Sequence, residues 1–259
     1  VRIPRFLVQT RCPLPSQPQF HLESEALLFA CQRQLGLDAT MLTGIERSAA
    51  LQGVPVDSKG DLFVNRAEQL TTRHERPLAA YAAGLAKGWR NHSVTTRIGD
   101  GYEAYSPGAK PDCIIKNAVR SGTRHLIVEF KVKSFVDGTG KPSPRAGEIA
   151  FDSTAPALLR AIDAKYAGAV RNGCEVVPVI LECSGAIHGD GLRLLHRAAY
   201  LAHGRRMIHD DPNAPWSAPT LRPYTLQAMS VALHKAIYAS VAERAAEERS
   251  AVGAGSMWE

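Results

Sequence analysis

The chain has 259 residues, 45% of them hydrophobic and 22% charged, a composition typical of a globular protein with one large or two small domains. No run of about eighteen apolar residues occurs, so the sequence predicts neither a membrane-spanning helix nor a membrane partner. The formal net charge of +6 and the pI of about 9.2 favour polyanionic partners such as nucleic acid.

Helical periodicity dominates the first third of the chain. Residues 1–21 are rich in proline and lack periodicity, which predicts an extended arm. Apolar residues then recur at helical spacing over 22–35 and 39–51, so we expect two short helices there. A longer helix is predicted from about Leu62 to Gly88, with Pro77 near its start.

Short runs rich in Val, Ile and Thr follow, separated by Gly, Pro and Asn, and these predict neighbouring strands over residues 93–98, 112–117 and 125–133. Residues 137–145 hold mainly Gly, Pro, Lys and Ser, which predicts a loop. The remaining elements are a helix over 153–171, a buried strand over 175–183, and helices over 190–203 and 226–249.

Five cysteines are spread along the chain without a CxxC pair or a Cys/His cluster. Their odd number and wide spacing predict free thiols rather than disulfides or a zinc site. We therefore expect an intracellular location, cytoplasm or nucleus, in a reducing compartment. The chain opens on Val1 without a signal-peptide pattern, which suggests a part of a larger polypeptide.

The residues that carry chemistry lie in the segment KPDCIIKNAVRSGTRHLIVEFKVK, which spans residues 110–133. Glu129 and Lys131 are two apart on a predicted strand, so their side chains project from the same face. A hairpin turning at Ser121-Gly122 would bring Asp112 level with Glu129 only if the hairpin were skewed or bulged.

A Glu and a Lys on one face of a strand that is otherwise Leu, Ile, Val and Phe are costly to bury without a partner or an ion. Two carboxylates, Asp112 and Glu129, with the backbone carbonyl of Phe130 and waters form a hard oxygen set that suits Mg²⁺ or Mn²⁺. The ammonium of Lys131 is placed to orient an attacking water or to stabilise developing charge. The sequence therefore predicts a metal site of Asp112, Glu129 and Phe130 with Lys131 beside it.

The pattern Pro111-Asp112, sixteen residues, Glu129-x-Lys131 resembles the signature of the PD-(D/E)xK, restriction-endonuclease-like nucleases. The resemblance covers about residues 62–203 and implies phosphodiester hydrolysis by a central four-stranded mixed sheet between helices. The segments VVPVILECSGAIHGDGLRLLHRAAY and TLQAMSVALHKAIYASVAE are similar to endonuclease portions attached to reverse transcriptases in some retroelements.

The resemblance also implies flanking site residues. Related nucleases often place a further acid near the start of the first core helix, where Glu75 lies, with Glu68 as the alternative; Glu103 is a third candidate acid. They also place Lys, Gln or Tyr on the helix after the loop, facing the scissile phosphate, which points to Lys165 and Tyr166. The remaining candidates, Arg160 and Arg171, would contact the nucleic-acid backbone.

We therefore expect an α/β fold with an N-terminal helical extension, divided into an arm and extension (1–58), a nuclease-like domain (59–249) and a tail (250–259). The expected activity is a Mg²⁺- or Mn²⁺-dependent endonuclease on DNA, with loop 137–145 over the substrate and a homodimer as a possible assembly. The alternative is a non-cleaving nucleic-acid-binding or scaffold module on the same fold. A phosphatase-like enzyme lacks support, because no P-loop, GxSxG, HExxH or Rossmann glycine pattern occurs.

Overall fold

A computed structural model describes residues 21–48, 53–64, 67–96, 109–118, 124–134, 150–203 and 220–255. These residues form seven α-helices, a short 3₁₀ helix, a two-stranded sheet and a four-stranded mixed sheet. The expected α/β class is therefore confirmed. Within the described parts of the chain, none of the helices combines the length and the apolar character needed to cross a membrane.

The four-stranded sheet has the order β3-β4-β5-β6, and its strands are β3 (Val94–Thr95), β4 (Cys113–Ile115), β5 (Leu126–Lys133) and β6 (Glu175–Glu182). The first two pairings are antiparallel, and β5 pairs with β6 in parallel. The long predicted strands β5 and β6 are confirmed to within a residue. Strand β4 ends before the expected residue 117, because Asn117 adopts a positive φ of 57° in a turn.

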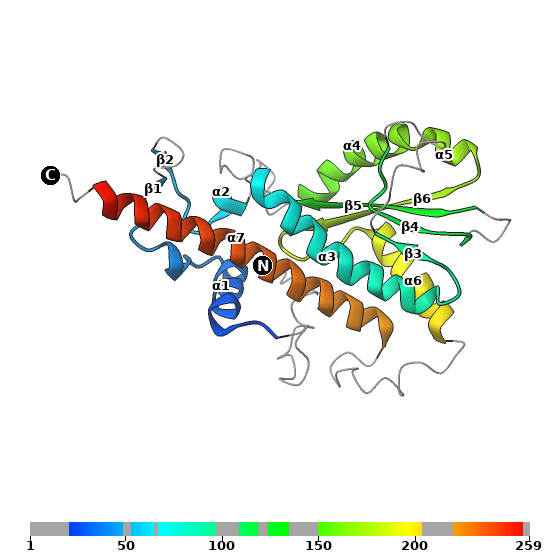
Figure 1. The fold of residues 1–259 in the computed structure, drawn as a ribbon, viewed down its shortest axis with the longest axis horizontal. Coiled ribbons are helices and arrows are strands. Elements are labelled where there is room, and N and C mark those ends of the chain that lie inside the picture. Colours follow the sequence, from blue (N-terminus) through cyan, green and yellow to red (C-terminus); the bar gives the residue numbers. More distant parts are fainter. Residues whose placement is uncertain are drawn as a thin grey trace.

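Helices cover both faces of this sheet (Figure 1). One face carries α3 (Ala67–Gly88) and α6 (Gly189–His203), and the other carries α4 (Ala150–Lys165) and α5 (Ala167–Arg171). Side chains of β5 alternate between the faces: Phe130 enters the larger core with α3 and α6, while Ile127 enters a smaller core under α4 and α5.

The longest helix, α7 (Leu221–Gly255), packs across α3 on the side away from the sheet (Figure 1). Glycines permit the close approach of α3 to its neighbours. A Cβ on Gly84 would lie 2.3 Å from Oγ1 of Thr225 on α7, and one on Gly88 would lie 2.6 Å from the Ala198 carbonyl oxygen of α6. Both positions therefore require glycine for this packing.

The N-terminal part consists of α1 (Ser24–Leu35), a 3₁₀ turn (Thr40–Leu42), a hairpin of β1 (Arg47–Ser48) with β2 (Val54–Pro55), and α2 (Asp61–Val64). The expected helix over 39–51 is wrong. Gly44 has a φ of 84°, which ends helical geometry, and the Ser48 hydroxyl donates a hydrogen bond to buried Glu248 of α7. A tertiary contact thus overrides the local periodicity.

Two further predicted helices are divided. The helix expected over 153–171 is interrupted at Tyr166, whose φ of −107° and ψ of 12° separate α4 from α5. The helix expected from Leu62 is formed by α2 and α3.

The main core contains Phe29 and Leu42 together with residues of α3 and α7, and α7 continues to Gly255. The division at residues 58 and 249 remains a prediction.

A buried histidine on α7 makes stability depend on pH. Burial lowers the pKa of His234 to about 4, with a further contribution from the charge of Arg33. In the unfolded chain the pKa is near 6.5, so the unfolded state binds a proton below pH 6.5 that the folded state does not. The stabilisation is complete above pH 6.5 and is lost as the pH falls from there towards 4.

We expect the free energy of unfolding to fall by about 3 kcal/mol across this window because of His234. His234→Gln should remove that pH dependence, whereas His196→Gln, at an exposed position of α6, should preserve it. Urea unfolding at about pH 7 and about pH 4.5 measures both. Equal pH dependence in wild type and His234→Gln would contradict the assignment.

Candidate active site

The register of β4 on β5 brings Asp112 and Glu129 to the same level. Cys113 pairs with Val128, and the next step along the antiparallel ladder places Asp112 opposite Glu129. The backbone N–H of Phe130 donates to Oδ2 of Asp112 at 2.7 Å. The expectation that a skewed or bulged hairpin is needed is therefore wrong, because the regular register already aligns the two acids.

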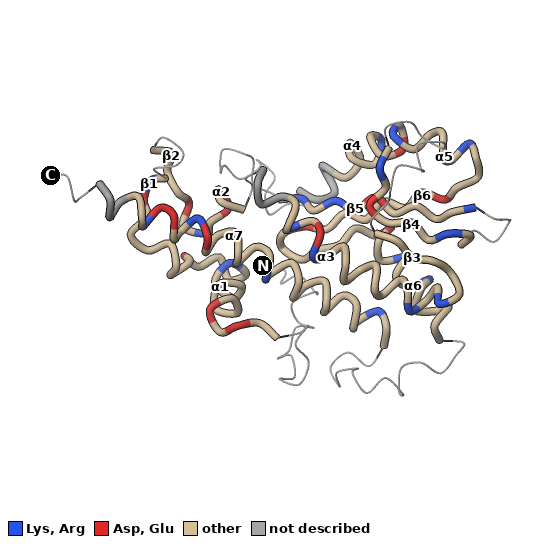
Figure 2. The backbone as a smooth tube through the Cα atoms, viewed as in Figure 1, with Lys and Arg blue, Asp and Glu red and all other residues tan. Residues whose placement is uncertain are grey.

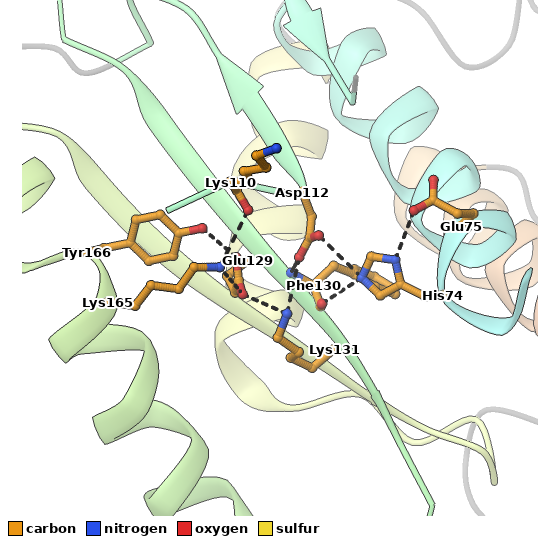
Figure 3. Close-up of polar contacts among 9 residues, drawn as sticks. All are labelled: His74, Glu75, Lys110, Asp112, Glu129, Phe130, Lys131, Lys165 and Tyr166. Carbon is orange, nitrogen blue, oxygen red and sulfur yellow. Dashed lines mark hydrogen bonds and ion pairs between the residues drawn. The ribbon is translucent and has the colours of Figure 1, made fainter. Parts of the chain in front are cut away.

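Lys131 joins the two acids, as the period-two alternation predicted (Figure 3). Its Nζ lies 2.6 Å from Oε1 of Glu129 and 3.6 Å from Oδ2 of Asp112. Glu129 is 1% exposed, while the side chains of Lys131 and Asp112 are 35% and 18% exposed. Of the three side chains, the Glu129 carboxylate is therefore buried, whereas the Lys131 ammonium and the Asp112 carboxylate are partly accessible.

Helix α4 and its C-terminal junction supply two further partners of Glu129 (Figure 3). Nζ of Lys165 lies 2.8 Å from Oε1, and the Tyr166 hydroxyl donates to Oε2 at 2.5 Å. The Lys165 ammonium also donates to the carbonyl of Lys110 at 3.4 Å. Both residues were predicted to face nucleic acid. They lie at the predicted site, where they hold a carboxylate, and their contact with nucleic acid remains a prediction.

His74 of α3 is the site residue that sequence reasoning missed. Its Nε2 donates to the Phe130 carbonyl at 2.9 Å and lies 3.5 Å from Oδ1 of Asp112. Its ring packs edge-on against the Phe130 ring, with centroids 5.6 Å apart. His74 directly precedes Glu75, the acid that the sequence analysis favours on this helix. The prediction of a site residue there was therefore displaced by one position.

Glu75 lies on the outer side of His74 (Figure 3). Its Oε1 is 3.3 Å from Nδ1 of His74, and its side chain is 58% exposed. The structure therefore connects Glu75 to the site through the imidazole. Its predicted role as a metal ligand remains a prediction.

The local charges favour an ionised pair of His74 and Asp112. Burial alone would raise the pKa of Asp112, but the hydrogen bond to His74, the charge of Lys131 and the Phe130 N–H outweigh it, so the pKa is lowered. Burial likewise opposes protonation of His74, but Asp112 and the Phe130 carbonyl raise its pKa above the usual value. Each group stabilises the charged form of the other.

The other candidates lie further out or outside the described residues. Arg160 on α4 and Arg171 on α5 are exposed. The side chain of Glu68, all of Glu103 and loop 137–145 fall outside the parts of the chain that the structure describes.

The oxygen donors of the site are two carboxylates and the Phe130 carbonyl. Across the described ranges, no group of three or more His, Cys, Asp or Glu side chains is arranged to hold a metal by itself. Mg²⁺ is commonly held by one or two carboxylates, with waters and substrate phosphates completing its shell. Asp112 and Glu129 fit that requirement, and Mn²⁺ accepts the same oxygen donors.

Comparisons of the chain with models of protein families, with curated proteins and with solved structures find no match.

Because Glu129 is buried, the ammonium of Lys165, which compensates the charge of its carboxylate, should contribute to the stability of the fold. Lys165→Met removes one of two ammonium groups from a carboxylate that cannot reach water, and we expect it to lower the free energy of unfolding by about 1 to 2 kcal/mol. Lys133→Met, at the exposed end of the same strand, is the matched control and should change little. Urea unfolding compares them, and equal losses would argue against the compensating role.

Proposed function

We propose that this protein is a Mg²⁺- or Mn²⁺-dependent endonuclease of the PD-(D/E)xK, restriction-endonuclease-like class that hydrolyses phosphodiester bonds of DNA. The observation that carries the proposal is the convergence of Asp112, Glu129 and Lys131 within hydrogen-bonding and ion-pairing distance. The element order α3, β3, β4, β5, α4, α5, β6, α6 supports the restriction-endonuclease-like assignment.

Asp112 and Glu129, with the Phe130 carbonyl, would hold the ion. When bound, a divalent cation polarises a phosphoryl oxygen and lowers the pKa of a water. The hydrogen bond from the Phe130 N–H orients Asp112, and the Tyr166 hydroxyl orients Glu129. These contacts set both carboxylates in place before any substrate arrives, which reduces the cost of ordering them during the reaction.

Lys131 would orient the attacking water and stabilise negative charge on the phosphate. Its ammonium already lies between the two carboxylates, at the more exposed end of the group. Lys165 provides a second ammonium on Glu129, so the removal of one lysine leaves the other. We assign the chemical role to Lys131 because it contacts both acids.

DNA is the proposed substrate because the chain carries a net charge of +6. Lys and Arg positions lie along the helices and strands around the sheet (Figure 2). Exposed Arg160 and Arg171, on the helical layer next to Lys165, would contact the backbone without reading sequence. Loop 137–145, between β5 and α4 in the sequence, would lie over the substrate.

We also propose an intracellular protein, in cytoplasm or nucleus, that forms part of a larger, retroelement-type polypeptide. Support for the compartment comes from the cysteines of the described residues, which form no disulfide with one another: Cys31, Cys113, Cys174 and Cys183.

A second candidate is a non-cleaving nucleic-acid-binding or scaffold module. It is favoured by one observation: both oxygens of Glu129 already have partners, namely two ammonium groups on Oε1 and a phenol on Oε2. A buried ion-pair network with only a structural role would have the same contacts.

Cleavage separates the two candidates. Labelled single-stranded, double-stranded and branched DNA should be cut by the wild type with Mg²⁺ or Mn²⁺ and not with EDTA. Lys131→Ala should lower the rate by about 100-fold or more, while Lys133→Ala, two residues further along the same face, should retain it. Binding without cleavage under any metal would favour the module, and cleavage that survives Lys131→Ala would exclude Lys131 as a catalytic residue.

Metal binding gives a test that does not depend on finding the substrate. Mn²⁺ should raise the melting temperature of the wild type, since an ion that binds only the folded state stabilises it. Asp112→Asn and Glu129→Gln should abolish this increase, and Asp190→Asn on α6 should keep it. Replacement of buried Glu129 can impair folding by itself. Asp112 is partly accessible, so Asp112→Asn tests metal binding with a smaller effect on folding. An unchanged increase in both site variants would exclude the proposed ion site.

A further inference from the structure

Helix α1 has two apolar faces, and the described residues cover only one of them. Ala26, Phe29 and Ala30 are buried, and the Phe29 ring packs edge-on against Tyr238 of α7. The outer side carries exposed leucines: Leu27, Leu28, Leu35 and, just beyond the helix, Leu37, with exposed fractions of 44%, 52%, 70% and 54%. We call these leucines, together with exposed Cys31, the apolar stripe of α1. Four of the seven exposed large hydrophobic side chains in the described residues therefore lie within eleven positions, a clustering typical of an interaction surface.

The spacing of this surface is symmetric about one residue. Leu27, Cys31 and Leu35 are four apart and so lie along one side of the helix, and Cys31 is also exposed. If two copies pack antiparallel about a two-fold axis at Cys31, Leu27 of each copy meets Leu35 of the other. A surface that complements itself in this way is the requirement for a two-fold dimer.

Charges at the two ends of α1 favour the same orientation. Glu23 and Glu25 lie at the start of the helix, where acidic residues gather in Figure 2. Nζ of Lys59 lies at the other end, 3.9 Å from where a Cβ on Gly36 would be. Antiparallel packing places the acidic end of each copy beside Lys59 of the other. The stripe itself has no charged side chain, so two copies with a net charge of +6 can approach there.

A groove of about 430 Å³ between α1 and α7 adjoins the stripe. Leu28 belongs to both, and Met41, Tyr238 and Ala242 also line the groove. A second copy thus finds apolar surface beyond the helix itself.

We propose that α1 is a dimer interface in which two copies of this chain pack antiparallel about Cys31. The helix has twelve residues, about 18 Å, which is short for an interface of standard size, so the dimer has a dissociation constant in the micromolar range. The inference is independent of whether the site described above cleaves DNA.

Thiol crosslinking at Cys31 tests the geometry. The full chain carrying Cys12→Ser is treated with a short bismaleimide; the cysteines 113, 174 and 183 are buried, so Cys31 is the accessible thiol of the described residues. We expect a covalent dimer that Cys31→Ser abolishes. Leu35→Asp should reduce its yield at least tenfold, whereas Val170→Asp, at another exposed apolar position on α5, should not.

Sedimentation of the unmodified protein provides the second measurement. Dimer at about 100 µM that dissociates on dilution and is lost in Leu35→Asp supports the proposal. A monomer at that concentration overturns it, as does crosslinking that Leu35→Asp leaves unchanged. Protection of Cys31 from a monofunctional maleimide in a monomer would also overturn it, because another segment would then cover the stripe.

Discussion

Burial of the Glu129 carboxylate constrains the structure around it. The residue lies in the middle of β5, on a strand whose other buried side chains are apolar, and only 1% of it is exposed. A charge removed from water without compensation costs several kcal/mol. Its neighbours supply that compensation with two ammonium groups and a phenol. The Tyr166 ring is buried at the interruption between α4 and α5, and its hydroxyl bonds the carboxylate.

The main chain of β5 links the two layers of helices. On one side of the sheet, Glu129 is held by the end of α4. The N–H of Phe130 bonds Asp112 and its carbonyl bonds His74, while its ring packs on the other side against α3. Asp112 therefore depends on a histidine from one helical layer, and Glu129 on a lysine from the other. Displacement of either layer would alter the separation of the two acids, so the geometry of the site depends on the packing of the whole domain.

Sequence periodicity predicted the elements that are long and regular, and spacing on a strand predicted the grouping of Glu129 with Lys131. Periodicity failed where tertiary contacts determine the local structure. The stretch 39–51 has helical spacing, yet Gly44 and the contact of Ser48 with Glu248 produce a hairpin. Neighbouring helical residues point about 100° apart, and a sequence does not define how a helix is rotated against a sheet. That rotation selects His74 rather than Glu75 to face the strands.

Helix α7 has a consequence for the order in which the protein can fold during synthesis. It has 35 residues, about 50 Å, and packs against α1, α2, α3 and α6. The bond between Ser48 and Glu248 joins residues 200 positions apart. A ribosome must therefore complete most of the chain before the N-terminal elements find their partner, and until then their apolar surfaces stay open to solvent and chaperones. Contacts so distant in sequence also slow folding, because the long intervening loop must close first.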